Sequence, residues 1–152
     1  MKPLIEFVWE DGADQSLGLP KYATPGAAGA DLRANIKNRS DMIMEAGTRA
    51  LISTGLHLAI AKGFEVQIRP RSGLALKHGI TLANAPGTID CDYRGPLGVI
   101  LLNVSSDAFT VSHGDRIAQM VVSSAVQAEF LWVNSLSTTT RGDGGFGSTG
   151  QK

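Results

Sequence analysis

Short segments with strict alternation of apolar and polar residues constrain the fold of this chain more than any other feature. In GFEVQIRP, at positions 63–70, every second residue is apolar. Successive side chains of a β-strand point to opposite faces, so this period predicts a strand with one buried face. Five other segments, rich in β-branched and aromatic residues, are also predicted to be strands: 3–9, 49–61, 98–104, 116–122 and 128–133.

Turn-forming residues separate these segments, and only SGLALKHG at 72–79 predicts a helix, of about two turns. Many short strands with so little helix predict an all-β fold, a distorted jelly roll or barrel with one short helix. A length of 152 residues with 43% hydrophobic residues fits one domain with a real core. We expect that domain to span 1–140, followed by a glycine-rich segment at 141–152.

The charge balance argues against a nucleic-acid partner. Lysine plus arginine and aspartate plus glutamate number 14 each, so the chain has no net charge and no broad basic field. A few local arginines would still suffice for a small anionic ligand.

The chain is expected to be cytoplasmic and to have no membrane partner. Its single cysteine, Cys91, excludes an internal disulfide. The N-terminal residues do not resemble a signal peptide, and no window approaches the roughly 20 apolar residues of a membrane span.

The segment RGDGGFGSTG at 141–150 is half glycine, and Phe146 is its only large apolar residue. Such a composition is typical of disorder, because the segment cannot bury enough surface to offset its ordering entropy. Its GxGxxG pattern is no dinucleotide fingerprint, since too few residues follow Gly147 to form the required helix. What Phe146 and Arg141 do is therefore left open by the segment itself.

Polar residues in four places suggest a binding or catalytic site. Asp90 and Asp92 are two residues apart, hence on one face if the chain is extended there. Arg71, followed by Ser72 and Gly73 at the start of the predicted helix, offers a guanidinium, a hydroxyl and free N–H groups to a phosphate.

The other two places lie at predicted strands. Asp31 follows a glycine-containing turn, and Arg116 and Gln119 interrupt an apolar strand. Taken singly, each has an ordinary structural alternative. Asp92 would be a turn residue, Arg116 an ion-pair partner and Gln119 a hydrogen-bonded core amide.

Five motifs in a fixed order together resemble the trimeric deoxyuridine triphosphatase (dUTPase) family of bacterial type. They are AGADL (28–32), RPRSGLALK (69–77), GTIDCDYRG (87–95), GDRIAQMVV (114–122) and RGDGGFGSTG (141–150). The resemblance implies a homotrimer of jelly-roll subunits that hydrolyses dUTP to dUMP and pyrophosphate with Mg²⁺. This reaction keeps uracil out of DNA and supplies dUMP for thymidylate synthesis.

By this resemblance Asp90 is the general base that activates water for attack on the α-phosphorus. Arg71, Ser72, the Gly73 amide and Arg141 would hold phosphates, and Asp31 would contact Mg²⁺ indirectly, through water. Tyr93 would lie against the deoxyribose and exclude a 2′-hydroxyl.

The uracil would be recognised by a predicted hairpin between Leu82 and Gly95. Its implied contacts are Asn84, Gly87, Thr88, Ile89 and Asp90, with Gly98 and Gln119 nearby.

The resemblance also gives the tail a function. Residues 141–152 would form a flexible lid, with Phe146 stacked on the uracil, Arg141 on a phosphate that Ser148 or Thr149 could cap, and Gly147 among the substrate contacts. Each site would be shared between subunits, with Asp31, Arg71 and Gln119 from one, Asp90 and Tyr93 from a second, and the tail from the third. Two alternatives remain: a dCTP deaminase-like enzyme and a non-catalytic nucleotide sensor on the same fold.

Overall fold

The computed structural model describes residues 2–145 of the chain. In chain order the elements are β1 (Ile5–Trp9), η1 (Gln15–Leu17), β2 (Lys21–Tyr22), β3 (Ala30–Arg33), η2 (Lys37–Arg39), β4 (Met42–Met44), β5 (Arg49–Ile60), β6 (Phe64–Arg69), α1 (Ser72–His78), β7 (Ile80–Leu82), β8 (Gly87–Ile89), β9 (Pro96–Asn103), β10 (Phe109–Val111) and β11 (Arg116–Ser124). Here η marks a single turn of 3₁₀ helix.

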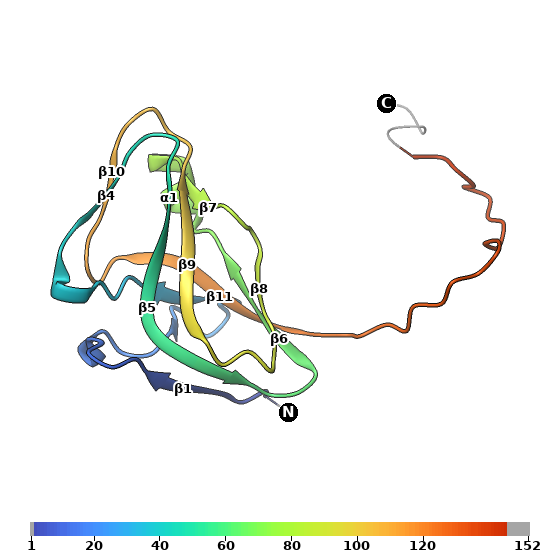
Figure 1. The fold of residues 1–152 in the computed structure, drawn as a ribbon, viewed down its shortest axis with the longest axis horizontal. Coiled ribbons are helices and arrows are strands. Elements are labelled where there is room, and N and C mark those ends of the chain that lie inside the picture. The colour runs from blue at the N-terminus through green and yellow to red at the C-terminus, as the bar shows by residue number, and fades with distance from the viewer. Residues whose placement is uncertain (1, 146–152) are drawn as a thin grey trace.

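Two antiparallel sheets form the body of the domain (Figure 1). One has the strand order β1-β5-β9-β7 and the other β2-β3-β11-β6-β8, while β4 and β10 form a small separate pair. The described residues contain one α-helix, at the predicted place. The all-β jelly-roll prediction is therefore confirmed, as are the strands expected around 3–9, 49–61, 63–70, 98–104 and 116–122.

The core lies between the two large sheets, as the period-two pattern requires. In β6, Val66 and Ile68 are buried, and in β9 the same holds for Leu97, Val99 and Leu101. Each such side chain contributes roughly 1.5–3 kcal/mol by leaving water. The opposite face of the β6 sheet is left free for polar residues.

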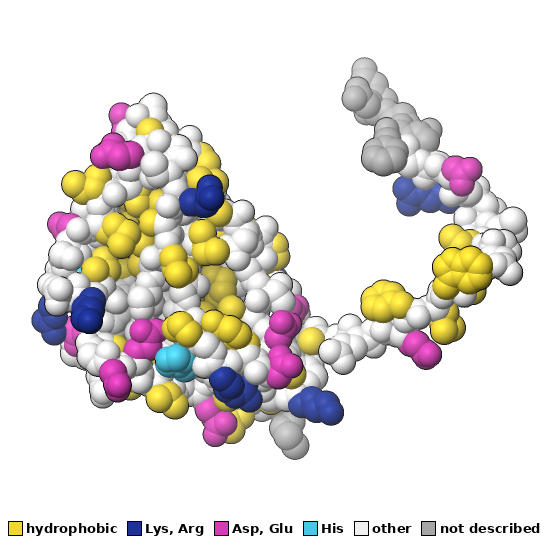
Figure 2. Space-filling view, viewed as in Figure 1, with side chains coloured by type: hydrophobic (Ala, Val, Ile, Leu, Met, Phe, Trp, Pro, Cys, Tyr) yellow, Lys and Arg dark blue, Asp and Glu magenta, His cyan; other side chains and the backbone are white. Residues whose placement is uncertain are grey.

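The strand predicted at 128–133 is absent, so that expectation was wrong for the single chain. Residues 125–145 contain no helix or strand and run away from the barrel (Figure 1). Phe130 is 93% exposed and Trp132 87% exposed, and yellow side chains stand out along this arm in Figure 2. The apolar pattern is that of a strand, but a strand forms only against a partner edge, and this chain does not present one to the segment.

The hairpin predicted between Leu82 and Gly95 does not form. The strand β7 pairs with β9, whereas β8 pairs with β6 in the other sheet. The segment therefore passes from one sheet to the other instead of closing a two-stranded ladder. Its sequence pattern could not distinguish these outcomes, because both need the same strand–turn–strand residues.

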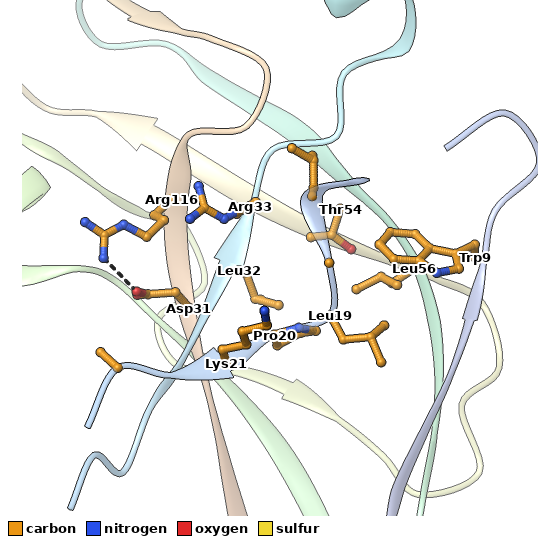
Figure 3. A pocket seen from close by; sticks show the side chains of 13 residues that line it. Trp9, Leu19, Pro20, Lys21, Asp31, Leu32, Arg33, Thr54, Leu56 and Arg116 are labelled. Carbon is orange, nitrogen blue, oxygen red and sulfur yellow. Dashed lines mark hydrogen bonds and ion pairs between the residues drawn. The ribbon is translucent and has the colours of Figure 1, made fainter. Parts of the chain in front are cut away.

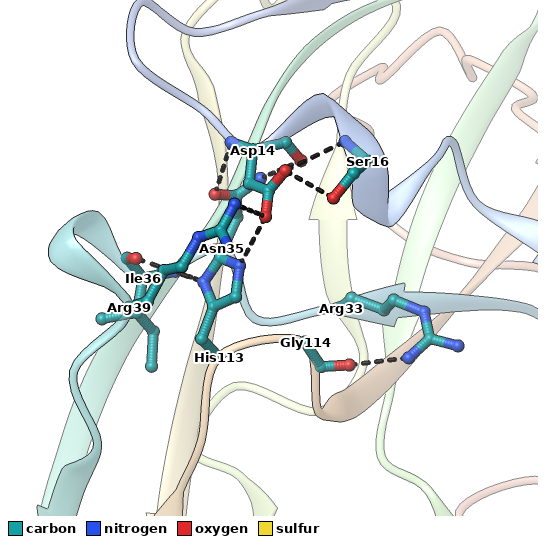
Figure 4. A network of polar contacts seen from close by, with 8 residues as sticks. All are labelled: Asp14, Ser16, Arg33, Asn35, Ile36, Arg39, His113 and Gly114. Carbon is teal, nitrogen blue, oxygen red and sulfur yellow. Dashed lines mark hydrogen bonds and ion pairs between the residues drawn. The ribbon is translucent and has the colours of Figure 1, made fainter.

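A polar network anchors the segment before β2 (Figure 4). Asp14 accepts hydrogen bonds from the Ser16 hydroxyl at 2.6 Å and from the Ser16 N–H at 3.0 Å. The Ile36 N–H donates to Nδ1 of His113 at 3.1 Å, and Nε2 of the same ring lies 3.1 Å from Asp14 Oδ2. Arg39 completes the network with an ion pair to Asp14 at 2.7 Å.

This network makes the stability of the fold depend on pH in acid. The Ser16 hydroxyl above all, with His113, lowers the pKa of Asp14 from 3.8 to about 2. A carboxylate with a depressed pKa in the folded state stabilises above its unfolded pKa and loses that contribution as pH falls through the folded value. We therefore expect the difference in unfolding free energy between the wild type and Asp14→Asn to shrink as pH falls from 3.8 to about 2.

Urea unfolding at a series of pH values and one protein concentration measures this difference. Asp11→Asn is the matched control, because Asp11 is exposed and its carboxylate has no ion-pair partner within 2–145. If Asp14→Asn and Asp11→Asn give parallel curves, Asp14 does not carry the acid dependence.

Candidate active site

The junction of β6 and α1 places Arg71, Ser72 and Gly73 together. The strand ends at Arg69, Pro70 interrupts it, and Arg71 has extended backbone angles (φ −90°, ψ 126°) before the helix begins at Ser72. No side chain caps this helix start, and a Cβ at Gly73 would meet nothing within 4 Å. The first N–H groups of α1 are therefore open to an acceptor, as a phosphate-binding turn requires.

A cluster of charged and polar side chains surrounds Asp31. Its Oδ2 lies 3.1 Å from Nη1 of Arg116, and its Oδ1 lies 3.4 Å from Nε of Arg71. The Gln119 amide donates to the same Oδ1 at 3.3 Å. The Asp31 side chain is only 14% exposed, so these three contacts fix its orientation.

Backbone register explains why these residues meet. Gln119 of β11 lies directly opposite Asp31 of β3, and Arg71 donates from Nη1 to the backbone oxygen of Arg116 at 2.8 Å. Gly29 passes close to Gln119, since a Cβ there would approach its Oε1 to 3.1 Å. Arg116 is thus an ion-pair partner and Gln119 a hydrogen-bonded amide, as their structural alternatives predicted. These same contacts assemble a candidate phosphate site.

Asp90 lies elsewhere on the chain. Ile89 pairs with Val66, so Asp90 follows at the level of Glu65, at the start of β6. Its carboxylate is exposed and borders an open pocket of about 840 Å³, together with Lys62, Cys91 and Arg94.

A turn follows Asp90, because the Tyr93 N–H donates to the Asp90 backbone oxygen at 3.2 Å. Asp90 and Asp92 therefore do not share the face of a strand, and the turn interpretation of Asp92 is correct. The Tyr93 hydroxyl donates to the Pro96 carbonyl at 3.1 Å, and its ring covers Gly95 so closely that a Cβ there would collide with it.

The candidate uracil-binding residues occupy the crossing between the sheets. Asn84 and Thr88 are exposed, Ile89 is half-buried, and Gly87 is buried. A Cβ at Gly87 would meet the Asn84 amide at 3.2 Å, so glycine allows the backbone to approach closely here. Gly98 lies in β9 opposite Ser53, where Leu51 fills the space that a side chain at position 98 would need.

Within a single chain, Asp90 lies apart from the Asp31 cluster. Glu65 and Arg69 are four residues apart on β6, which corresponds to about 13 Å along a strand. Arg71 follows one end of β6, and Asp90 lies at the other. Within 2–145, then, the structure assembles Asp31, Arg71, Arg116 and Gln119 and leaves Asp90 and Tyr93 apart from them.

Arg141 is the one tail candidate within the described residues, and its side-chain hydrogen bond stays within the tail. Its Nε donates to the Gly144 carbonyl at 2.8 Å within a local turn, at the end of the arm formed by residues 125–145. Phe146, Gly147 and Ser148 lie outside the described residues.

Two further observations bear on metals and membranes. Within the described part of the chain, no three aspartate, glutamate, histidine or cysteine side chains gather closely enough to hold a metal ion by themselves. No helix among residues 2–145 is both long enough and apolar enough to span a bilayer.

Comparison with solved structures identifies the same fold in phage proteins. The dUTPase of Staphylococcus bacteriophage 80alpha, solved with dUpNHpp, superposes with a TM-score of 0.83 at 22% identity, over 97% of this chain and 98% of that one. A mutant dUTPase from phage phi11 of S. aureus, described with a structural Mg(II) ion, gives a TM-score of 0.75 at 18% identity and covers 89% and 99% of the two chains.

Sequence comparison gives closer relatives. The deoxyuridine 5'-triphosphate nucleotidohydrolase of Roseobacter denitrificans is 60% identical over 146 residues, covering 96% of this chain and 95% of its own. The enzyme of the same name from Dinoroseobacter shibae is 54% identical over 154 aligned residues, covering 99% of each chain. The family model for dUTPase matches residues 15–150. A match over almost the whole chain, with relatives this similar, shows that this chain belongs to the dUTPase family.

Proposed function

We propose that this chain hydrolyses dUTP to dUMP and pyrophosphate, as a cytoplasmic homotrimer that uses Mg²⁺. Family membership over residues 15–150 carries the proposal. The Asp31 cluster adds independent support, because two guanidinium groups and an open helix start within one small region suit a polyphosphate.

The separation of Asp90 from Arg71 supports a site shared between subunits. A general base must come within hydrogen-bond reach of its water, directly beside the phosphate under attack. The two groups lie at opposite ends of β6, so a neighbouring subunit would supply Asp90 and Tyr93 to the Asp31 cluster. A closed ring with threefold symmetry repeats this arrangement at each interface.

The exposed arm supports the same assembly. Because 128–133 is not a strand of the barrel, the free segment between β11 and Arg141 comprises residues 125–140, which can span up to about 50 Å. Its apolar side chains, Phe130 and Trp132 among them, would be covered by a neighbouring subunit. Residues 1–140, the barrel with its arm, would thus deliver the lid, 141–152, to a site on another copy.

In the proposed reaction Asp90 accepts a proton from a water molecule as the water oxygen bonds to the α-phosphorus. The bond between the α-phosphorus and the bridging oxygen to the β-phosphate breaks, and pyrophosphate leaves. Arg71, Ser72 and the Gly73 N–H would hold the phosphates throughout, with Arg141 reaching the terminal one. Gln119 would orient the water or the Asp31 carboxylate, to which its amide already donates.

The described residues fit a magnesium ion carried by the substrate. With no cluster of three metal-ligating side chains in the part of the chain described, the protein would offer the ion few oxygens, and Mg²⁺ commonly retains most of its waters. Asp31 would accept hydrogen bonds from those waters, since a carboxylate oxygen has more than one lone pair to offer. The ion would neutralise charge on the triphosphate.

The test of this function is a substrate comparison. Purified protein with Mg²⁺ is expected to release pyrophosphate from dUTP and no ammonia from dCTP. Ammonia from dCTP would instead identify a deaminase, and nucleotide binding without turnover would identify a sensor.

Substitution of Tyr93 tests how ribose is excluded. The Tyr93→Ala variant is expected to lower the ratio of kcat/KM for dUTP to that for UTP by about tenfold or more, because the ring no longer collides with a 2′-hydroxyl. Tyr93→Phe is the matched control, since it keeps the ring and loses only the hydrogen bond to the Pro96 carbonyl. An unchanged ratio in Tyr93→Ala would show that this ring does not select the sugar.

A further inference from the structure

A second hollow adjoins the Asp31 cluster, next to the β2 edge of the five-stranded sheet (Figure 3). It encloses about 190 Å³ and has Trp9, Leu19 and Leu56 among its apolar walls. Lys21, Arg33 and Arg116 lie around the same hollow, and Asp31 is the only acidic residue among the described residues that line it. The volume suits a group of a few heavy atoms, and the charges suit an anion.

Strand register places Lys21 in line with proposed site residues. It lies directly opposite Asp31, which in turn lies opposite Gln119. Residues opposite each other in neighbouring strands share one face of the sheet, at spacings of about 4.8 Å. Lys21 therefore extends the row of Asp31 and Gln119 by one strand, although no sequence motif includes it.

The positive charge here exceeds what Asp31 can balance. Its carboxylate already contacts Arg71 and Arg116. Neither Lys21 nor Arg33 has a carboxylate within 4.0 Å among residues 2–145. Arg33 is nevertheless held in place, because its Nη1 donates to the Gly114 carbonyl at 2.7 Å and leaves other N–H groups free.

We propose that this hollow is a subsite for a phosphate group, with Lys21 and Arg33 as its ligands. Lys21 and Arg33 are both exposed but border one concave surface, so both attract an anion that enters it. The inference rests on the proposed function for the source of the phosphate, which is either the terminal phosphate of the bound triphosphate or the released pyrophosphate. Both sources present the same chemistry, a terminal phosphate whose oxygens accept hydrogen bonds.

Calorimetric titration of the full-length protein tests the subsite without any turnover. The ligands are inorganic pyrophosphate and a non-hydrolysable imido analogue of dUTP, with dUMP as a ligand that has no pyrophosphate group. Lys21→Gln is expected to weaken binding of pyrophosphate, the analogue or both by at least about fivefold, the loss of one charge-assisted hydrogen bond from an exposed lysine. Lys21→Arg should restore the affinity, because it restores a cationic donor.

Lys37→Gln is the matched control, since it removes the same charge from an exposed lysine outside this hollow. Weakening specific to pyrophosphate would assign the subsite to the product, and weakening specific to the analogue would assign it to the substrate. If Lys21→Gln matches Lys37→Gln for both ligands, or weakens dUMP equally, the subsite does not exist. Failure of the wild type to hydrolyse dUTP would refute the proposed function but would leave a Lys21-dependent affinity for pyrophosphate standing.

Discussion

Replacing Asp90 by asparagine is expected to lower kcat for dUTP by about 10²-fold or more, the contribution of a positioned general base. Asparagine keeps the shape of the side chain, and the backbone oxygen at position 90 would still accept from the Tyr93 N–H. It cannot accept the proton of the attacking water at neutral pH. Affinity for a non-hydrolysable dUTP analogue should therefore survive, so that the loss appears in kcat.

Asp92→Asn is the matched control for this experiment. Asp92 lies in the same turn and borders the same pocket, so its substitution removes an equal charge from the same region. It is expected to retain most of the wild-type kcat. If Asp90→Asn keeps more than about a tenth of wild-type kcat, against the factor expected of a base, Asp90 does not act as one.

Removal of the tail is the second change with a large expected effect. A chain that ends at Thr140 lacks Arg141 and the proposed lid, and its kcat/KM for dUTP is expected to fall by about 10²-fold, the scale of losses when substrate positioning is impaired. The barrel should remain folded, because residues 125–145 add no helix or strand to it. Circular dichroism and urea unfolding check that the truncated chain is otherwise intact.

Mixed trimers then test whether the lid works on another subunit. One chain carries Asp90→Asn with an intact tail, and the other ends at Thr140 with Asp90 intact. After the two are unfolded and refolded together in equal amounts, roughly a quarter of the sites should combine a good base with a good tail, because cyclic symmetry draws each from a different copy. Recovery of activity toward that fraction is the expected result.

Native mass spectrometry must show that the mixed trimers form. If they form and activity stays at the level of the two parents, Asp90 and the tail serve one site from the same chain. The exposed arm would then fold back onto its own barrel, and the shared-site proposal would be wrong.

Local sequence was sufficient to predict the structure of those segments whose own residues determine it. Alternation of Val66 and Ile68 with polar neighbours specified β6, and the residues SGLALKHG at 72–79 located α1. Polar residues within apolar strands likewise pointed to the candidate site, as Gln119 in β11 illustrates. In each case the physical cause acts within a few residues, through side-chain alternation or intrinsic helix preference.

The pairing of strands that are distant in the chain could not be predicted from local sequence. The pattern at 128–133 is typical of a strand. A strand forms only against the edge of another strand, however, and the single chain provides no such edge for this segment. The hairpin predicted between Leu82 and Gly95 was wrong for a related reason: β8 pairs with β6 and not with β7, and backbone hydrogen bonds are the same for any partner strand.

The sequence by itself determined the all-β class, the position of the helix and the family, because these follow from local periodicity and from motifs in a fixed order. Only the tertiary structure decided that Asp31 meets Arg71 and Arg116, that Asp90 lies at the far end of β6, and that Lys21 joins the row of Asp31 and Gln119. Those contacts depend on strand order and register, and the two partners Asp31 and Arg116 are 85 residues apart in the chain. Register is set by how whole sheets bury their apolar faces together, and no single segment contains that information.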